Sequence, residues 1–196
     1  ALDLGRHVAH AFKDEKDGVV REYRAKKYAS VADGLTDLEL IEGDATFADP
    51  HTVALGDRRV TGDRVLVATG SRPTVPPIPG LDTVPYLTSD LLDGDEAGRL
   101  TELPESLVVL GGGYVAVELA QMFSRLGSRV TMIARSGLLS GYEPDLGRTL
   151  GEVFVAEGID VLSGARVERV SDIERAVALA VELPGAGRIV RAERLL

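Results

Sequence analysis

The chain has 196 residues, which is enough for one full domain or two small ones with a buried core. It is 44% hydrophobic and 27% charged, as is typical of a soluble globular protein. The net charge is −9 with no Lys/Arg-rich patch, so nucleic-acid binding is not expected, and no apolar run approaches the roughly 20 residues that cross a bilayer. The chain contains no cysteine, which excludes disulfides, thiolate metal sites and thiol redox chemistry from this segment, and we expect no metal site in it.

Residues 1–29 predict a charged helix, because apolar residues recur at helical spacing from Val8 to Tyr23 with charges between them. The start shows no basic segment followed by an apolar stretch, so we expect no secretory signal and a cytoplasmic protein. Because the chain does not begin with Met, we expect it to be a piece of a longer one.

Short strand-like pieces follow, separated by turns at Asp49-Pro50 and Gly56-Asp57. Residues 72–85 hold five prolines and are interpreted as an extended connector. We place a domain boundary just after it, which predicts one domain at residues 1–89 and another at 90–196. The predicted strands of the first part are Leu38–Ile41, Ala45–Phe47, Thr52–Leu55 and Arg64–Thr69.

The second half alternates strands with helices, which predicts an α/β fold with a Rossmann-like, doubly wound parallel sheet. After Gly164 three strand-like pieces with a Pro184–Gly187 turn predict an antiparallel meander. The predicted elements are strand Leu107–Leu110, helix Tyr114–Leu126, strand Arg129–Ile133, helix Asp145–Glu157, strand Ile159–Leu162, and the meander strands Ala165–Ser171, Ala176–Leu183 and Gly187–Ala192.

The segment Val108–Glu118 combines a strand, a tight turn and a helix with the pattern G-x-G-x-x-A. Gly111 allows a sharp turn, Gly113 lets a pyrophosphate approach the backbone, and Ala116 lets helix and strand pack closely. The helix N-terminus then presents free N–H groups to the phosphates. The bare motif also fits an ordinary tight turn, but the flanking strands and the amphipathic helix favour a dinucleotide site.

The second strand of this unit ends at Ala134-Arg135. An NAD site usually has Asp or Glu at this point to bind the ribose hydroxyls. Arginine instead attracts a 2′-phosphate and bonds it in a fork, so the sequence favours NADPH over NADH. The alternative is that Arg135 is a solvated surface residue.

Two motifs in the first half carry a resemblance to a known family. Thr61–Pro73 resembles the T-x(n)-hhh-A-T-G motif of flavoproteins with two dinucleotide-binding sites, and Gly43–Phe47 resembles their G-x-A-x-F segment. The chain is therefore identified as resembling the pyridine nucleotide–disulfide oxidoreductases. Within that family, Leu66–Leu81 and Val117–Ser128 are most similar to the bacterial mercuric reductases.

This resemblance implies roles for particular residues. Ala45, Ala68, Thr69 and Gly70 would lie along the FAD, while Gly111, Gly112, Gly113, Tyr114, Val115, Glu118 and Arg135 would form the NADPH site. Tyr114 matches the aromatic residue that covers the nicotinamide face of the flavin until NADPH displaces it. Glu118 matches an acidic residue that reaches a lysine beside the flavin. The alternatives are a packed surface aromatic for Tyr114 and an exposed helix glutamate for Glu118.

The family also has parts that this chain lacks. The first glycine motif for FAD and the redox-active cysteine pair would precede Ala1, and a second A-T-G segment and a dimerisation domain would follow Leu196. We therefore expect a full-length homodimer, in which electrons pass from NADPH to FAD, to a cysteine pair and to Hg(II). Its partners would be small nucleotides, with no nucleic acid and no membrane. This segment alone would bind NADPH at best, without flavin or activity.

Two other functions stay open. The same scaffold serves other acceptors in dihydrolipoamide dehydrogenase and glutathione reductase, and a dihydrolipoamide enzyme would be expected to use NAD, against which Ala134-Arg135 argues. A non-catalytic dinucleotide-binding module is disfavoured by the intact glycine turn beside a second nucleotide motif.

Overall fold

A computed structural model of the chain describes residues 4–29, 35–90, 100, 102–174 and 176–196. The contacts divide the chain into two compact units, one made of Glu15–Arg72 and the other of Ala1–Asp14 with Pro73–Leu196. Each unit is described by itself below.

A helix occupies most of the first 29 residues, as expected. It is α1 (Leu4–Tyr23), and it continues as the π-helical segment η1 (Arg24–Ala29). Among the described residues no helix is both long enough and apolar enough to span a membrane.

Three short strands form the antiparallel sheet of the Glu15–Arg72 unit. They are β1 (Ala45–Asp49), β2 (Thr52–Leu55) and β3 (Arg58–Thr61), paired in that order. The strands expected at Ala45–Phe47 and Thr52–Leu55 are confirmed, whereas β3 was not predicted because its polar residues show no apolar alternation. It forms because Gly56, at a φ of 57°, turns the chain back against β2.

The strands expected at Leu38–Ile41 and Arg64–Thr69 are wrong. Both segments have apolar side chains, but a strand also needs a neighbour to accept and donate its backbone hydrogen bonds, and neither segment pairs with another. Leu40 is 76% exposed and Leu66 is 90% exposed, so these β-prone segments lie uncovered. Apolar patterning alone could not reveal that neither segment pairs with a strand among the described residues.

A four-stranded parallel sheet forms the centre of the other unit and confirms the predicted fold class. Its order is β10-β4-β5-β6, with every pair parallel. Three of the strands match the sequence prediction, while the fourth, of two residues, is too short to show any pattern. The strands are β4 (Ser106–Leu110), β5 (Arg129–Ala134), β6 (Asp160–Ser163) and β10 (Arg194–Leu195).

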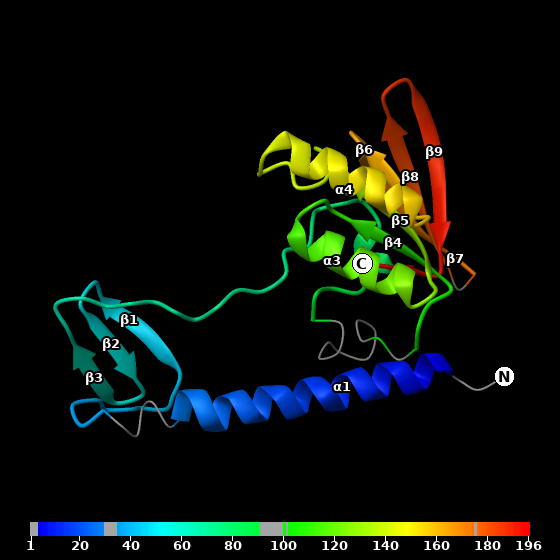
Figure 1. Cartoon of the computed structure of the whole chain (residues 1–196). Coiled ribbons are helices and arrows are strands. Elements are labelled where there is room, and N and C mark those ends of the chain that lie inside the picture. The colour runs from blue at the N-terminus through cyan, green and yellow to red at the C-terminus, as the bar shows by residue number, and fades with distance from the viewer. Residues whose placement is uncertain (1–3, 30–34, 91–99, 101, 175) are drawn as a thin grey trace. The chain divides into compact units, whose positions relative to one another are not determined.

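Two helices cover one face of this sheet, and the meander covers the other (Figure 1). The helices are α3 (Tyr114–Arg125) and α4 (Pro144–Ala156). The meander is β7 (Arg166–Ile173), β8 (Ala176–Leu183) and β9 (Ala186–Ala192), antiparallel as predicted. The second face of the doubly wound unit is therefore closed by strands.

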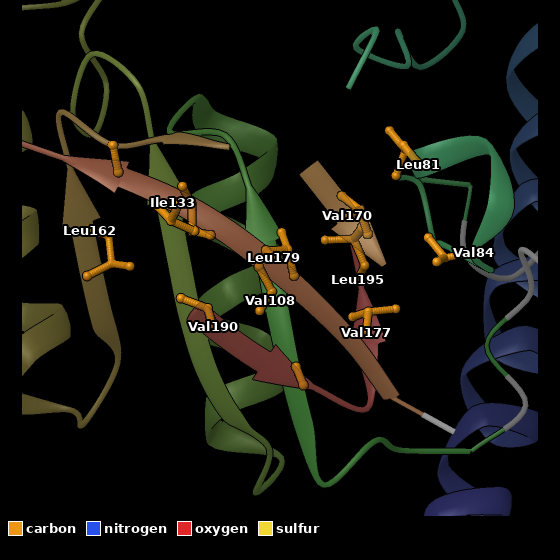
Figure 2. Packing of buried hydrophobic residues seen from close by; sticks show 13 residues of the cluster. Leu81, Val84, Val108, Ile133, Leu162, Val170, Val177, Leu179, Val190 and Leu195 are labelled. Carbon is orange, nitrogen blue, oxygen red and sulfur yellow. The ribbon is translucent and has the colours of Figure 1, made fainter. Parts of the chain in front are cut away.

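Alternation along β4 divides its side chains between two apolar layers. Leu107 and Val109 pack with the buried Phe123 of α3 and Phe154 of α4. Val108 faces the other way, into the layer that holds Leu179 of the meander (Figure 2). The period of two along a strand produces this division, and both layers hold the carboxyl edge of the sheet rigid.

The proline-rich segment is fastened to the meander. The Val170 amide donates to the Pro79 carbonyl at 2.9 Å, and Gly80 has a φ of 83°, with no room for a side chain beside the Val170 carbonyl. The short 3₁₀-helix η2 (Leu81–Thr83) follows, and its Leu81 lies beside Val170 in Figure 2. These contacts group residues 73–89 with the second half of the chain, whereas the domain boundary at 89/90 stays a prediction.

One polar cluster joins α3 to the end of α4. Glu157 accepts hydrogen bonds from the guanidinium of Arg125 at 2.7 Å and from the amide of Gln121 at 3.0 Å. The bonds from Arg125 and then Gln121 hold the pKa of the Glu157 carboxyl below its usual 4.5. A carboxyl with a lowered folded-state pKa stabilises the fold above its unfolded pKa, and this stability is lost as the pH falls through the lowered value.

Replacing Glu157 by glutamine is therefore expected to lower the melting temperature by about 1–4 °C near pH 6, because an exposed charged cluster contributes little. The gap between wild type and E157Q should shrink as the pH falls below 4.5 through the lowered pKa of Glu157, which thermal denaturation at several pH values would measure. E152Q is the matched control, since Glu152 pairs with Arg148 of its own helix and joins no second element. A gap that does not depend on pH would contradict this assignment.

Candidate nucleotide-binding site

The glycine turn lies between the carboxyl end of β4 and the start of α3. Gly111 has a φ of 125°, and its amide donates to the Ile133 carbonyl of β5 at 2.9 Å. Gly113 is the N-cap of α3, and the first intrahelical bond runs from Val117 back to Gly113 at 3.0 Å. The earlier amides of the helix therefore have no intrahelical acceptor and can bind an anion.

The three glycines of the turn are required for three different reasons. Gly111 has a positive φ that other residues rarely adopt. At Gly112 a Cβ atom would clash with the carbonyl of Gly137 and approach the Cβ of Ala134 to 3.0 Å. At Gly113 a Cβ would meet no atom within 4 Å, so this position opens onto free space where a phosphate could approach.

The loop that follows β5 is fixed against this turn. The Leu139 amide donates to the Gly112 carbonyl at 2.6 Å, and Leu139 has a φ of 49°, which is uncommon for a residue with a side chain. Since Arg135 begins this loop, the same contacts place its backbone beside the glycine turn.

A cavity of about 850 Å³, here called the charged cavity, opens beside the turn. Its charged residues are Arg135, Arg166 and Glu168, all exposed, and none of the three side chains makes a hydrogen bond or ion pair with another described residue. Two unpaired arginines in a chain of net charge −9 make this cavity suited to an anion. The remaining lining residues are Pro76–Pro79, Leu110–Gly112, Ile133, Ser136, Gly137, Ser140, Ala165 and Val167.

A second cavity, of about 400 Å³ and here called the apolar cavity, meets the first at Gly111. Tyr114 lines it and is 62% exposed, and Val115 lines it as well. Leu195 and Thr88 border its other side, where the Leu87 amide donates to the Leu195 carbonyl at 2.7 Å. The glycine turn thus lies between a charged compartment and an apolar one.

The predicted site residues separate into three groups. The three glycines, Tyr114, Val115 and Arg135 border the two cavities. Glu118 is exposed on α3 and borders neither cavity. The residues predicted for FAD, which are Ala45, Ala68, Thr69 and Gly70, are exposed in the Glu15–Arg72 unit.

Sequence reasoning missed Ser136, Ser140, Arg166 and Glu168 as lining residues of the charged cavity. The two serines lie close to Arg135 in the chain, and their proximity to it was the available signal. Arg166 and Glu168 carry no motif, since the fold alone brings β7 to this position.

A model of the pyridine nucleotide-disulphide oxidoreductase family matches residues 5–196. The chain belongs to this family. Among its relatives, the mercuric reductase of Bacillus cereus is 40% identical over 183 residues, which cover 93% of this chain and 28% of that protein. The mercuric reductase of Streptomyces lividans is 41% identical, with 92% of this chain and 38% of that protein covered.

A solved structure of the family has the same fold. The HOCl-induced flavoprotein disulfide reductase RclA of Escherichia coli aligns with a TM-score of 0.75 and 30% identity, over 97% of this chain and 44% of that one. The chain thus spans between a quarter and a half of the length of these relatives. The family is one of flavin-dependent oxidoreductases that use a pyridine nucleotide, as the sequence motifs indicated.

Proposed function

We propose that this chain is the NADPH-binding portion of a longer flavin-dependent oxidoreductase of the mercuric reductase type. The observation that carries the proposal is the glycine turn, whose free helix amides border the apolar cavity while Arg135 and Arg166, which have no partner among the described residues, line the adjoining charged cavity. Phosphate groups are the ligands that both features favour.

The position of each feature matches one part of NADPH. The pyrophosphate would lie at Gly113, where the open space and the first amides of α3 meet. The adenosine ribose would lie at the end of β5, where Ala134 is buried and has no carboxylate to bind a free 2′-hydroxyl. Arg135 then supplies a charge for a 2′-phosphate, and Arg166 in the same cavity supplies a second.

The nicotinamide half would extend past Gly111 toward the apolar cavity. Tyr114 is exposed there and is the residue that would contact the nicotinamide ring or cover its place. Glu118 would act on the flavin side through a lysine in the rest of the protein. Bound NADPH would supply a hydride to the flavin, and the residues of this chain would hold and orient its dihydronicotinamide ring.

The FAD and the electron acceptor belong to the proposal for the longer protein. Ala45, Ala68, Thr69 and Gly70 would contribute to its FAD site, and a cysteine pair elsewhere would pass electrons to Hg(II). The names of the relatives support mercury as acceptor, while a disulfide acceptor is the second candidate because RclA is a disulfide reductase. A cytoplasmic homodimer stays the expected form of the whole protein.

Calorimetric titration of the chain with NADPH and NADH tests this function. We expect NADPH to bind at least about tenfold more tightly, since a charge-assisted contact to the 2′-phosphate contributes about 1.5–3 kcal/mol. Equal dissociation constants would overturn the preference for NADPH. Failure of both nucleotides to bind would overturn the nucleotide site itself.

A further inference from the structure

We propose that Glu168 accepts a hydrogen bond from the exocyclic amine of the adenine ring and so restricts the nucleotide base to adenine. This inference rests on the proposed NADPH site and adds to it a residue that selects the base.

The start of β7 lies where the base of a bound nucleotide would arrive. The strands lie side by side in the order β4, β5, β6, and the Ala165 amide donates to the Ala134 carbonyl at 3.3 Å. A nucleotide with its pyrophosphate at β4 and its ribose at β5 therefore carries its base toward residues 165–168. These residues line the charged cavity together with Gly111 and Gly112 of the glycine turn.

A β-bulge places Glu168 in the cavity. Across the β7–β8 pair Val167 lies opposite Val181 and Arg169 lies opposite Ala180, so Glu168 has no partner in the ladder. In a regular strand successive side chains point to opposite faces, whereas a bulge redirects one of them. Glu168 lines the charged cavity together with Ala165, Arg166 and Val167, the residues that precede it.

Glu168 needs a hydrogen-bond donor on the ligand, and the donor that the adenine base itself offers is its exocyclic amine. An ionised carboxylate only accepts hydrogen bonds, and it would repel both the pyrophosphate and the 2′-phosphate. The adenine amine is a donor on the edge of the base that lies away from the ribose and its 2′-phosphate. Glu168 makes no hydrogen bond or ion pair within the described part of the chain, so its oxygens are available for that amine.

Two further features arrange the cavity wall beside Glu168 for an adenine ring. Ile78 and Val167 both line the cavity and are partly buried, so they offer apolar surfaces to a flat ring. The bond between Val170 and Pro79 fastens the proline-rich segment to the bulged strand. The wall of the cavity that carries Ile78 and the strand that carries Glu168 are thus held together before a ligand binds.

The test compares NADPH with nicotinamide hypoxanthine dinucleotide phosphate, in which a carbonyl oxygen replaces the adenine amine. The whole chain should bind NADPH about tenfold more tightly than this analogue, because the bond from the amine is lost and the oxygen that replaces it is repelled by the carboxylate. In E168Q the amide can donate to that oxygen, so the analogue should gain affinity and NADPH should lose affinity. The preference for NADPH over the analogue should then fall from about tenfold to between about one- and threefold. D172N is the matched control, because Asp172 lies exposed on the same strand and outside the cavity, and it should keep the wild-type ratio.

The outcomes separate the two proposals. The role of Glu168 would be overturned if the chain bound NADPH and the hypoxanthine analogue equally well. It would also be overturned if E168Q kept the wild-type ratio of the two affinities. Neither result would affect the proposed NADPH site. A chain that binds neither compound would overturn the proposed function and this inference with it. Thermal denaturation of E168Q provides a check of the fold, and we expect it to match wild type because the side chain is exposed.

Discussion

Replacing Gly112 by alanine is expected to lower the melting temperature of the chain by about 2–10 °C and to remove NADPH binding. The added methyl group would clash with the carbonyl of Gly137, and neither backbone can yield without moving a loop. Overpacking of this kind costs about 1–3 kcal/mol. The displaced loop would also lose the bond between Leu139 and Gly112, and it would carry Arg135 away from the phosphate turn.

Gly113→Ala is the matched control, because its methyl group enters open space and its φ of −76° suits alanine. We expect G113A to keep the wild-type melting temperature within about 1–2 °C, since the change in stability should stay within about 0.5 kcal/mol. NADPH binding should nevertheless fall by tenfold or more, because the methyl group occupies the approach of the pyrophosphate. Equal stability losses in G112A and G113A would contradict the separate reasons assigned to the two glycines.

Replacing Arg135 by glutamate is expected to reverse the preference between the two nucleotides. NADPH should bind about 10–100-fold more weakly, because a charge-assisted contact of about 1.5–3 kcal/mol is replaced by repulsion of the 2′-phosphate. NADH should bind equally well or better, because a carboxylate at this edge of the sheet can accept bonds from the free ribose hydroxyls. Titration of both nucleotides at one ionic strength measures the ratio.

Arg129→Glu provides the charge-matched control, since Arg129 is exposed at the opposite end of the same strand and lines neither cavity. It changes the net charge of the chain by the same amount and should leave the ratio of the two affinities as it is. A ratio that shifts equally in both variants would mean that the overall field, and no specific contact at Arg135, sets the preference.

How far the sequence predicts this molecule depends on whether a feature is local. The glycine turn, α3 and β5 carry strong local patterns, and the structure has all three where they were expected. The two-residue strand β10 and the polar strand β3 have no pattern of their own, because each exists only through its pairing with a neighbour. The strand expected at Arg64–Thr69 is wrong for the converse reason, since this apolar segment pairs with no other strand in the described part of the chain.

The same distinction between local and non-local features explains which residues of the candidate site could be predicted from the sequence. Arg135 could be identified because it directly follows a strand that the pattern already placed. Arg166 reaches the cavity because β7 begins beside the end of β5, and the bulge that follows Val167 bears on Glu168. A bulge depends on the register between two strands, and no spacing within β7 alone encodes it.

The bond from Leu139 to Gly112 has a consequence for redesign of this protein. It makes the five-residue path from Arg135 to Leu139 a fixed span, closed at one end by β5 and at the other by the glycine turn. Side-chain exchanges at residue 134 or 135 leave that span intact, whereas an insertion or deletion within it would shift the glycine turn. Nucleotide preference can therefore be re-engineered by substitution, and loop grafting from relatives would succeed only where the length is conserved.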